Sequence, residues 1–260
     1  MIKQLGSLGR LAVRTAAVAS SLATAAAMAF AVPGASAGAE QGATASNSGS
    51  GAGAARACRN GYVGLTYDDG PTAATLPSLL AALRKAGVRA TFFNQGNRAA
   101  ERPDLVHAEL RAGHWVGTHT ITHPHLPQLD DQTIYDEIAG AQYILKGITG
   151  RWPTLFREPF GEVNDQIRTD LKSLGPLEVL WTVDSRDWAG ATVDEIVAAA
   201  DTLQPGGIIL EHDWVQNSID ALPIIVEHLK ARGLCPGKIV FTPENIPFST
   251  TFFHAIAVRP

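Results

Sequence analysis

The sequence predicts an α/β fold with a parallel β-sheet closed into a barrel; one observation indicates the parallel sheet, and a second favours a barrel over an open sheet. First, from residue 61 onward short β-rich runs alternate with segments of helical periodicity, the order typical of parallel sheets. Second, unusual polar residues follow five of these runs, in "DDGP", "THTITHPH", "REPFGE", "DSRDW" and "HDW". A barrel brings the carboxyl ends of all its strands to one face, whereas an open sheet gathers only those near its switch point.

We expect strands at "GYVGLTY", "VRATFFN", "HWVG", "PTLFR", "LEVLWTV" and "GGIILEH". The first strand precedes leucines at helical spacing between residues 76 and 83, and this helix should end at Gly87. The next helices are expected at "PDLVHAELRAG", from near Asp130, and at residues 165–174. The last two strands precede helical segments at 192–203 and 219–232.

The composition is that of a globular protein. A chain of 260 residues, 45% hydrophobic and 18% charged, is long enough to bury a full core in one large domain or two small ones. The formal net charge of -4 gives no sign of a nucleic-acid binder, whose affinity would depend on neutralising phosphates. A neutral or weakly charged substrate fits this composition better.

The amino terminus predicts export. Lys3, Arg10 and Arg14 precede an Ala-rich apolar stretch over residues 15–32 and the small residues at 35–37, which is the pattern of a secretory signal peptide over residues 1–37 with cleavage after Ala37. A membrane anchor is the alternative, but the stretch is short and weakly hydrophobic, so we expect a secreted, extracellular protein with no stable anchor after processing. Residues 38–57 are rich in Gly, Ser and Ala and should form a disordered linker.

The chain contains two cysteines, Cys58 and Cys235, and export favours a disulfide between them over two unpaired thiols. This bond would join the two ends of one domain. No internal repeat and no second linker is visible after the first cysteine. We therefore expect residues 58–260 to form one domain, and the protein to be a monomer.

His119 and His123 have the spacing of metal ligands. They are four residues apart, so in a helical turn both imidazoles would point the same way. Such a pair also arises by chance on solvated surfaces. Asp68 and Asp69 are adjacent carboxylates that need a cation, and two imidazoles with one carboxylate would leave open positions, as in catalytic zinc sites.

One carboxylate of the Asp pair is left to act as a base. If either Asp68 or Asp69 binds the metal, the other lies close enough to accept a proton from a water in the site. The alternative is an ordinary turn, because Asp, Gly and Pro all favour turns and "DDGP" contains all three.

Five motifs in order give the chain a specific resemblance: "TYDDGP", "HTITHP", "REPFG", "DSRDW" and "LEH". Together they resemble the polysaccharide deacetylases of carbohydrate esterase family four, the NodB-homology family, over residues 61–228. The sequence is most similar to secreted actinobacterial acetylxylan esterases and chitin or chitooligosaccharide deacetylases. This resemblance implies a single-domain, distorted (β/α) barrel of the NodB-homology type.

The resemblance also implies roles for individual residues and a divalent metal, with Zn²⁺ expected first and Co²⁺ or Mn²⁺ as alternatives. The implied metal ligands are Asp69, His119 and His123. The implied catalytic residues are Asp68 as general base, Arg157 as its orienting partner, and His212 as general acid tuned by Asp187. The implied substrate-binding residues are Phe160, through its backbone N–H, with Trp188 and Leu210 as walls of an acetyl pocket. From its position after "HD", Trp214 is a candidate for stacking on a sugar ring.

The resemblance implies a hydrolase that releases acetate from an acetylated polysaccharide or oligosaccharide. Acetylxylan, chitin and chitooligosaccharide are the substrates expected, and peptidoglycan N-acetylglucosamine is an alternative. The third motif departs from the usual Arg-Pro-Pro-Tyr, with Glu158 adding a charge near the site and Phe160 replacing the tyrosine. A non-catalytic sugar-binding protein and a glycosidase are the rival functions; adjacent aspartates do not resemble two carboxyls flanking a scissile bond.

Overall fold

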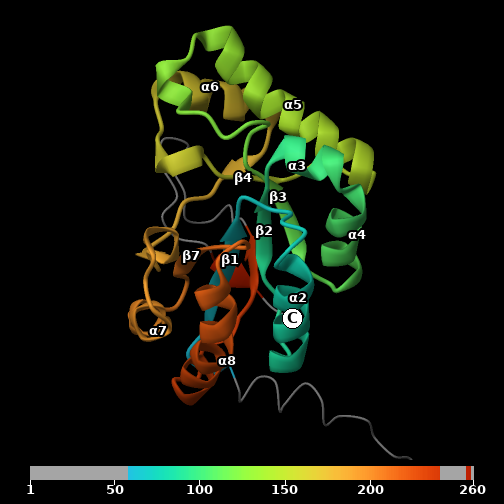
Figure 1. The fold of residues 1–260 in the computed structure, drawn as a ribbon. Helices are drawn as coiled ribbons and strands as arrows, with labels where there is room; N and C mark the ends of the chain where they lie inside the picture. The colour runs from blue at the N-terminus through green and yellow to red at the C-terminus, as the bar shows by residue number, and fades with distance from the viewer. Residues whose placement is uncertain (1–57, 241–255, 259–260) are drawn as a thin grey trace, which may run out of the picture. The chain divides into compact units, whose positions relative to one another are not determined.

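The computed structural model describes residues 58–240 and 256–258 (Figure 1). The chain divides into residues 1–46 and 47–260, and all described residues belong to the second unit. The leader predicted at 1–37 and the linker predicted at 38–57 lie outside the described residues. Within the described part, none of the helices has the length and apolar character needed to cross a membrane.

The centre of the fold is an eight-stranded sheet in which every strand pair is parallel. Its strands run in the order β5-β4-β3-β2-β1-β7-β6, with β8 paired to the start of β1. Their bounds are β1 Tyr62–Asp68, β2 Thr91–Asn94, β3 Trp115–Thr118, β4 Leu155–Phe156, β5 Leu177–Glu178, β6 Val183–Asp184, β7 Ile208–His212 and β8 Cys235–Pro236. A separate antiparallel pair joins β9, Lys238–Val240, to β10, Ile256–Val258. The curled parallel sheet confirms the barrel-type α/β fold.

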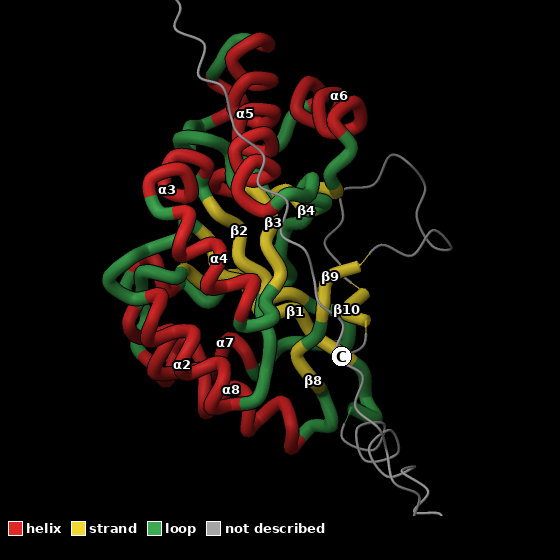
Figure 2. Tube along the Cα trace, turned by 90° about the vertical axis from the view of Figure 1, so that its right-hand side faces the viewer, coloured by secondary structure: helices red, strands yellow, loops and turns green. Residues whose placement is uncertain are grey.

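The helices alternate with these strands as the sequence predicts. They are α2 Leu76–Ala86, α3 Gly96–Glu101, α4 Pro103–Arg111, α5 Asp131–Thr149, α6 Asp165–Leu174, α7 Val193–Ala200 and α8 Gln216–Ala231. In Figure 2, α2, α3, α4 and α8 lie on one side of strands β1 to β3. Within this layer α8 packs against α2 and α7, while α5 packs against α3 and α6.

Local signals account for several helix ends. Gly87 follows α2 with φ 70°, a left-handed conformation that glycine adopts without steric cost. The Asp130 side chain accepts a hydrogen bond from the Thr133 backbone N–H and begins α5. Thr192 and Glu195 form a reciprocal capping box at the start of α7. The helix boundaries expected at Gly87 and Asp130 are therefore confirmed.

Strand β1 is buried on both faces. Its side chains alternate, so the apolar ones pack into the core on one face and polar ones lie on the other. Val63, Leu65 and Tyr67 belong to the apolar cluster that includes leucines of α2 and α8. Because successive side chains of a strand point to opposite faces, Thr66 and Asp68 point away from this helix layer. The period of this strand thus directs the first predicted catalytic carboxylate toward the inside of the curl.

The expectation of one strand at "LEVLWTV" is wrong. Its first two residues form β5 at one edge of the sheet, and its last residue, Val183, begins β6 at the other edge. Between them, the Val179 N–H donates to Phe156 and the Thr182 N–H donates to Ile208, so the segment crosses from one edge to the other. The carbonyls of Val179 and Leu180 accept from the Arg157 guanidinium, at 2.9 and 3.2 Å, instead of from a neighbouring strand.

The predicted disulfide between Cys58 and Cys235 is present and joins residues 177 positions apart. It connects the segment just before β1 to β8. Backbone hydrogen bonds support the same junction, from the Cys235 N–H to the Gly61 oxygen at 3.1 Å and from the Asn60 N–H to the Gly233 oxygen at 2.9 Å.

Candidate active site

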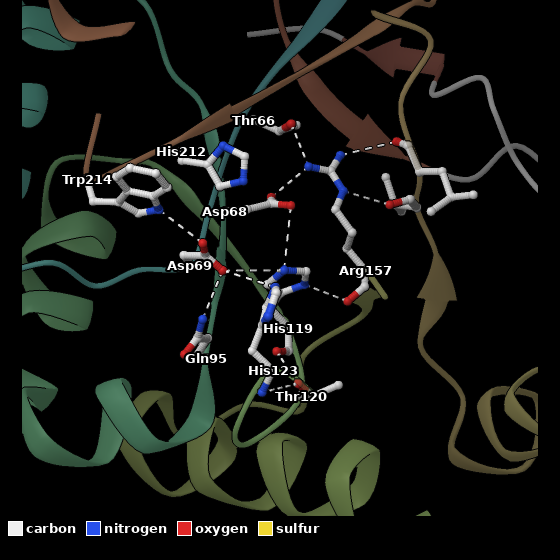
Figure 3. A network of polar contacts seen from close by, with 12 residues as sticks. Thr66, Asp68, Asp69, Gln95, His119, Thr120, His123, Arg157, His212 and Trp214 are labelled. Carbon is white, nitrogen blue, oxygen red and sulfur yellow. Dashed lines mark hydrogen bonds and ion pairs between the residues drawn. The ribbon is translucent and has the colours of Figure 1, made fainter. Parts of the chain in front are cut away.

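The predicted site residues meet at the carboxyl ends of the central strands (Figure 3). Asp68 ends β1 and is the register partner of His212, which ends the neighbouring strand β7. His119 directly follows β3 and Arg157 directly follows β4, and these two strands are also neighbours. The parallel sheet therefore brings together residues that are up to 144 positions apart in the sequence, the separation of Asp68 from His212 (212 − 68).

Asp69, His119 and His123 form the one cluster of potential metal ligands within the described residues. One ligand atom from each lies within 4.8 Å of the others. Asp69 Oδ1 is 3.7 Å from His119 Nε2 and 3.3 Å from His123 Nε2. Ligand atoms around a tetrahedral zinc ion lie roughly 3.3 to 3.6 Å apart, so this donor set and its spacing fit a divalent ion.

The expectation that the two histidines share a helical turn is wrong. They lie in an irregular loop, and Thr120 and His123 have φ of 60° and 63°, values that break a helix. The Thr120 hydroxyl donates to the His119 oxygen and accepts from the His123 N–H at 3.0 Å. A compact turn of this kind, instead of a helix, directs both imidazoles toward Asp69.

The hydrogen bonds of His119 determine which of its nitrogens can bind a metal. Its Nδ1 lies 2.7 Å from the carbonyl oxygen of Arg157, so this nitrogen carries the proton and Nε2 keeps its lone pair. Burial lowers the pKa of His123, and the nearby His119 adds to the effect. Both imidazoles are thereby suited to act as neutral ligands.

Asp69 is held in a strained conformation with both carboxylate oxygens engaged. Its φ is 70°, in the left-handed region that an aspartate adopts at a cost. Oδ1 accepts from Gln95 Nε2 at 2.9 Å, and Oδ2 accepts from Trp214 Nε1 at 3.0 Å. Burial would raise the pKa of Asp69, but in acid the protonated imidazoles of His119 and His123 outweigh burial and the net shift is downward. The lowered pKa favours the ionised carboxylate of Asp69, which is the form that binds a metal.

The turn after Asp69 is hydrogen-bonded to Asp213, the residue that directly follows β7. Asp213 accepts from both the backbone N–H and the hydroxyl of Thr72, each at 2.7 Å. Gly70 lies in the same turn, and a Cβ added to it would lie 2.7 Å from Asp213 Oδ2 and 2.6 Å from Asn94 Oδ1. Only glycine fits this close approach, which explains the glycine of "DDGP".

Asp68 and Arg157 form a buried ion pair at the inner side of the site. Arg157 Nη1 donates to Asp68 Oδ1 at 2.7 Å and to the Thr66 hydroxyl at 2.8 Å. Within the described part of the chain, no donor bonds Oδ2 of Asp68, which faces His119 Nε2 at 3.8 Å. One carboxylate oxygen is therefore anchored while the other is directed toward the metal-ligand cluster.

His212, at the end of the neighbouring strand β7, and Asp187, in the turn after β6, form a second hydrogen-bonded pair. Asp187 accepts from His212 Nδ1 at 2.8 Å and from the His212 backbone N–H at 2.7 Å. The Ser218 hydroxyl and the Trp188 N–H also donate to this carboxylate. Burial would lower the pKa of His212, but the hydrogen bond and the charge of Asp187 outweigh it and raise the pKa overall.

Three of the four predicted substrate-binding residues carry exposed aromatic rings near this cluster. Phe160 is about half exposed, and its ring centroid lies 4.6 Å from that of His123. Trp188 is also half exposed, and its Nε1 donates to Asp184. Trp214 lies 5.5 Å from the His212 ring. Leu210 is buried two residues before His212 on β7, so both side chains point to the same face of the strand.

Glu158 is buried, contrary to the expectation that it adds a charge near the site. It is fully shielded from solvent, and neither carboxylate oxygen has a hydrogen-bond partner among the described residues. Burial, followed by the nearby Glu178, raises its pKa well above the ordinary 4.5. The side chain is therefore shielded from the solvent of the site, and its pKa shift favours the uncharged form.

Sequence reasoning missed several residues that hold the site together. Gln95 bonds a metal-ligand candidate, Thr66 bonds Arg157, and Ser218 bonds Asp187. Gln95 directly follows β2, and position at a strand end is the signal that could have found it. Ser218 lies in α8, where nothing in the local sequence marks it as a partner of the site.

Comparison with known proteins finds a family model described as polysaccharide deacetylase, which matches residues 56–178. The chain is 42% identical over 183 residues to a bifunctional xylanase/xylan deacetylase of Cellvibrio japonicus, covering 69% of this chain and 27% of that protein. It is 35% identical over 182 residues to a peptidoglycan-N-acetylglucosamine deacetylase of Listeria monocytogenes, covering 68% of this chain and 38% of that protein. The chain thus spans well under half the length of these two relatives.

Among solved structures, a family 4 carbohydrate esterase from Streptomyces lividans in complex with acetate is similar to this chain. The two superpose with a TM-score of 0.69 and 46% sequence identity, and the match covers 76% of this chain and 98% of that one. The likeness extends over nearly the whole of that esterase domain.

Proposed function

The chain belongs to the polysaccharide deacetylase family, carbohydrate esterase family four, and on that premise we propose that it is a metal-dependent hydrolase of acetyl groups on carbohydrates. The observation that carries the proposal is the arrangement of two polar pairs around one ligand cluster. Asp68 and His212 end the neighbouring strands β1 and β7 beside Asp69, and they are paired with Arg157 and Asp187 respectively.

The proposed metal site consists of Asp69, His119 and His123. Its support is the chemistry of the donor set, with one carboxylate and two neutral imidazoles whose ligand atoms lie within 4.8 Å of one another. Three protein ligands leave an open position, as catalytic zinc sites require, and Co²⁺ or Mn²⁺ are alternatives. When bound there, the ion supplies Lewis-acid chemistry, polarising a carbonyl and lowering the pKa of water.

Asp68 is the proposed general base. Its Oδ2 accepts the proton of the attacking water, while Arg157 holds Oδ1 and keeps the carboxylate in place through the step. The same arginine bonds the Val179 and Leu180 carbonyls, so it is itself fixed on three sides. A base in this position contributes about a hundredfold to ten-thousandfold to the rate.

His212 is the proposed general acid. Its Nδ1 is committed to Asp187, so the proton for the leaving group is carried on Nε2. The raised pKa of His212 favours the protonated imidazole relative to an ordinary histidine, which suits an acid. The bond between the acetyl carbon and the sugar oxygen or nitrogen then breaks, the sugar alcohol or amine leaves with that proton, and acetate is the second product. The Phe160 backbone N–H is the proposed donor to the oxyanion, with Trp188 and Leu210 beside the acetyl group.

The proposed substrates are acetylxylan, chitin or chitooligosaccharide. The xylan deacetylase relative has a higher identity than the peptidoglycan relative, 42% against 35%. Exposed rings at Phe160, Trp188 and Trp214 are suited to contact sugars. Peptidoglycan N-acetylglucosamine is the second candidate because of the Listeria relative.

We further propose that the protein is secreted as a monomer after removal of residues 1–37, with 38–57 as a linker and 58–260 as the catalytic domain. The disulfide between Cys58 and Cys235 supports an oxidising compartment.

The test is acetate release from acetylxylan, chitooligosaccharide and peptidoglycan, measured with new reducing ends on the same samples. We expect acetate without reducing ends, and a loss of at least a hundredfold in Asp68→Asn. Asp104→Asn is the matched control, because Asp104 is an exposed carboxylate on α4 paired with Arg102. Reducing ends without acetate would identify a glycosidase, and polymer binding without acetate would identify a non-catalytic protein.

A further inference from the structure

The loop between the two proposed histidine ligands is held by a carboxylate outside the site. Glu137 lies on α5, and its Oε2 accepts from the backbone N–H groups of Ile121 and Thr122, at 2.8 and 2.9 Å. Its Oε1 accepts from the Thr122 hydroxyl at 2.7 Å. One side chain therefore binds both amides in the middle of the segment from His119 to His123.

The carbonyls of the same loop are held from the other side by α3. The Gly96 N–H donates to the Thr120 oxygen at 2.8 Å, and the Asn97 N–H donates to the Ile121 oxygen at 3.1 Å. Helices α3 and α5 pack against each other, so the loop lies between two fixed partners. Backbone N–H groups of α3 donate to the carbonyls of the loop, and the Glu137 carboxylate accepts from the amides of the loop.

The fit of α5 to this loop includes shape as well as hydrogen bonds. Gly140 is three residues after Glu137 and so lies on the same face of the helix. A Cβ on Gly140 would lie 2.3 Å from Ile121 Cδ1, so any larger residue there would require the Ile121 side chain to shift. The same face of α5 therefore accommodates the Ile121 side chain at Gly140 and binds the Ile121 backbone through Glu137.

The loop needs this support because its backbone is strained. Thr120 and His123 both adopt left-handed conformations, which are unfavourable for residues with a side chain and persist only where the surroundings enforce them. Without an acceptor at position 137, the amides of Ile121 and Thr122 would be satisfied by water, and the loop would be free to relax. Relaxation would move the His123 imidazole relative to His119.

We infer that Glu137 is a positioning residue that holds the His119–His123 loop in its metal-binding conformation. The inference rests on the proposed metal site, and it concerns metal affinity, which is measured without any carbohydrate. Partners that orient metal ligands typically contribute tenfold to a hundredfold to affinity.

The test is the Zn²⁺ Kd of the full chain, measured by competition with a chelating dye after the metal has been stripped. Glu137→Met keeps the length of the side chain and removes its acceptors, and we expect Zn²⁺ binding to weaken about tenfold. Glu137→Gln should stay within about threefold of wild type, because one amide oxygen can accept both N–H groups while its NH₂ donates to the Thr122 hydroxyl. Asp136→Leu is the matched control, since it removes one charge from the same helix and Asp136 bonds Gln132 instead of the loop.

Hydrogen exchange of the metal-free protein gives a second readout. Peptides covering residues 119–125 should lose protection in Glu137→Met and keep it in Glu137→Gln. If the Met variant does not fold, Glu137→Asp takes its place, because its shorter side chain cannot reach both amides. Wild-type affinity in the Met or Asp variant, or an equal loss in Asp136→Leu, would overturn the inference. A wild-type chain that binds no divalent metal would instead overturn the proposed metal site.

Discussion

Removing the disulfide should destabilise the protein strongly without impairing the site. The perturbation is the double substitution Cys58→Ser with Cys235→Ser. The bond joins residues 177 positions apart, and the chain-entropy model gives roughly 5 kcal/mol for a loop of that length at 25 °C. Measured losses for native disulfides are about 2 to 5 kcal/mol, a large share of the 5 to 15 kcal/mol typical of folded proteins.

The folded state should change little, because backbone contacts hold the same junction. β8 pairs with the start of β1, and the Cys235 N–H donates to the Gly61 oxygen at 3.1 Å. Asp68 lies at the other end of β1, about 20 Å along the strand at roughly 3.3 Å per residue. The loss should therefore arise mainly in the unfolded state, which gains freedom when the cross-link is absent.

Urea unfolding at 25 °C, followed by tryptophan fluorescence, measures this effect. We expect the free energy of unfolding to fall by 2 to 5 kcal/mol and the m-value to rise, because the uncrosslinked chain exposes more surface. Under folding conditions kcat should equal that of wild type. A fall of less than about 1 kcal/mol would refute the chain-entropy reasoning, and a lower kcat in fully folded variant would refute the claim that β1 keeps its position.

Three further predictions concern the site and the pH dependence of stability. Stripping the metal with a chelator should abolish acetate release, and adding a divalent ion should restore it. Asp68→Asn should keep the metal, whereas His119→Ala should lose it. Equal metal contents of these two variants by elemental analysis would contradict this division of roles. His212→Ala should lose more turnover on an N-acetyl substrate than on nitrophenyl acetate, whose leaving group needs no proton, so equal losses on both would assign the acid to another residue. Burial, with a smaller contribution from Arg89, lowers the pKa of His114 from 6.5 to about 4, so the unfolded chain binds a proton there at a pH where the folded protein does not. About 3 kcal/mol of stability should be lost between pH 7 and pH 4, and His114→Gln should flatten this part of the urea-midpoint curve; an unchanged curve would rule out His114 as the cause.

The order of elements and the grouping of the site could be predicted from the sequence. Alternating strand and helix patterns specify a parallel sheet, and such a sheet places the carboxyl ends of its strands at one edge. That rule alone brings Asp69 and His119 together, although 50 residues separate them (119 − 69). Helix ends at Gly87 and Asp130 were also predictable, because their capping interactions involve residues close in sequence.

The tertiary structure alone decided the features that depend on distant hydrogen-bond partners. "LEVLWTV" has the pattern of a strand, yet only its two ends lie in the sheet. Carbonyls in its middle accept hydrogen bonds from Arg157, which is 22 residues away from Val179. His119 and His123 have helical spacing, but Glu137 binds the amides between them from 15 and 16 residues away and holds an irregular loop. Periodicity reports which residues share a face of a regular element. It carries no information about backbone groups whose partners are side chains brought close only by folding.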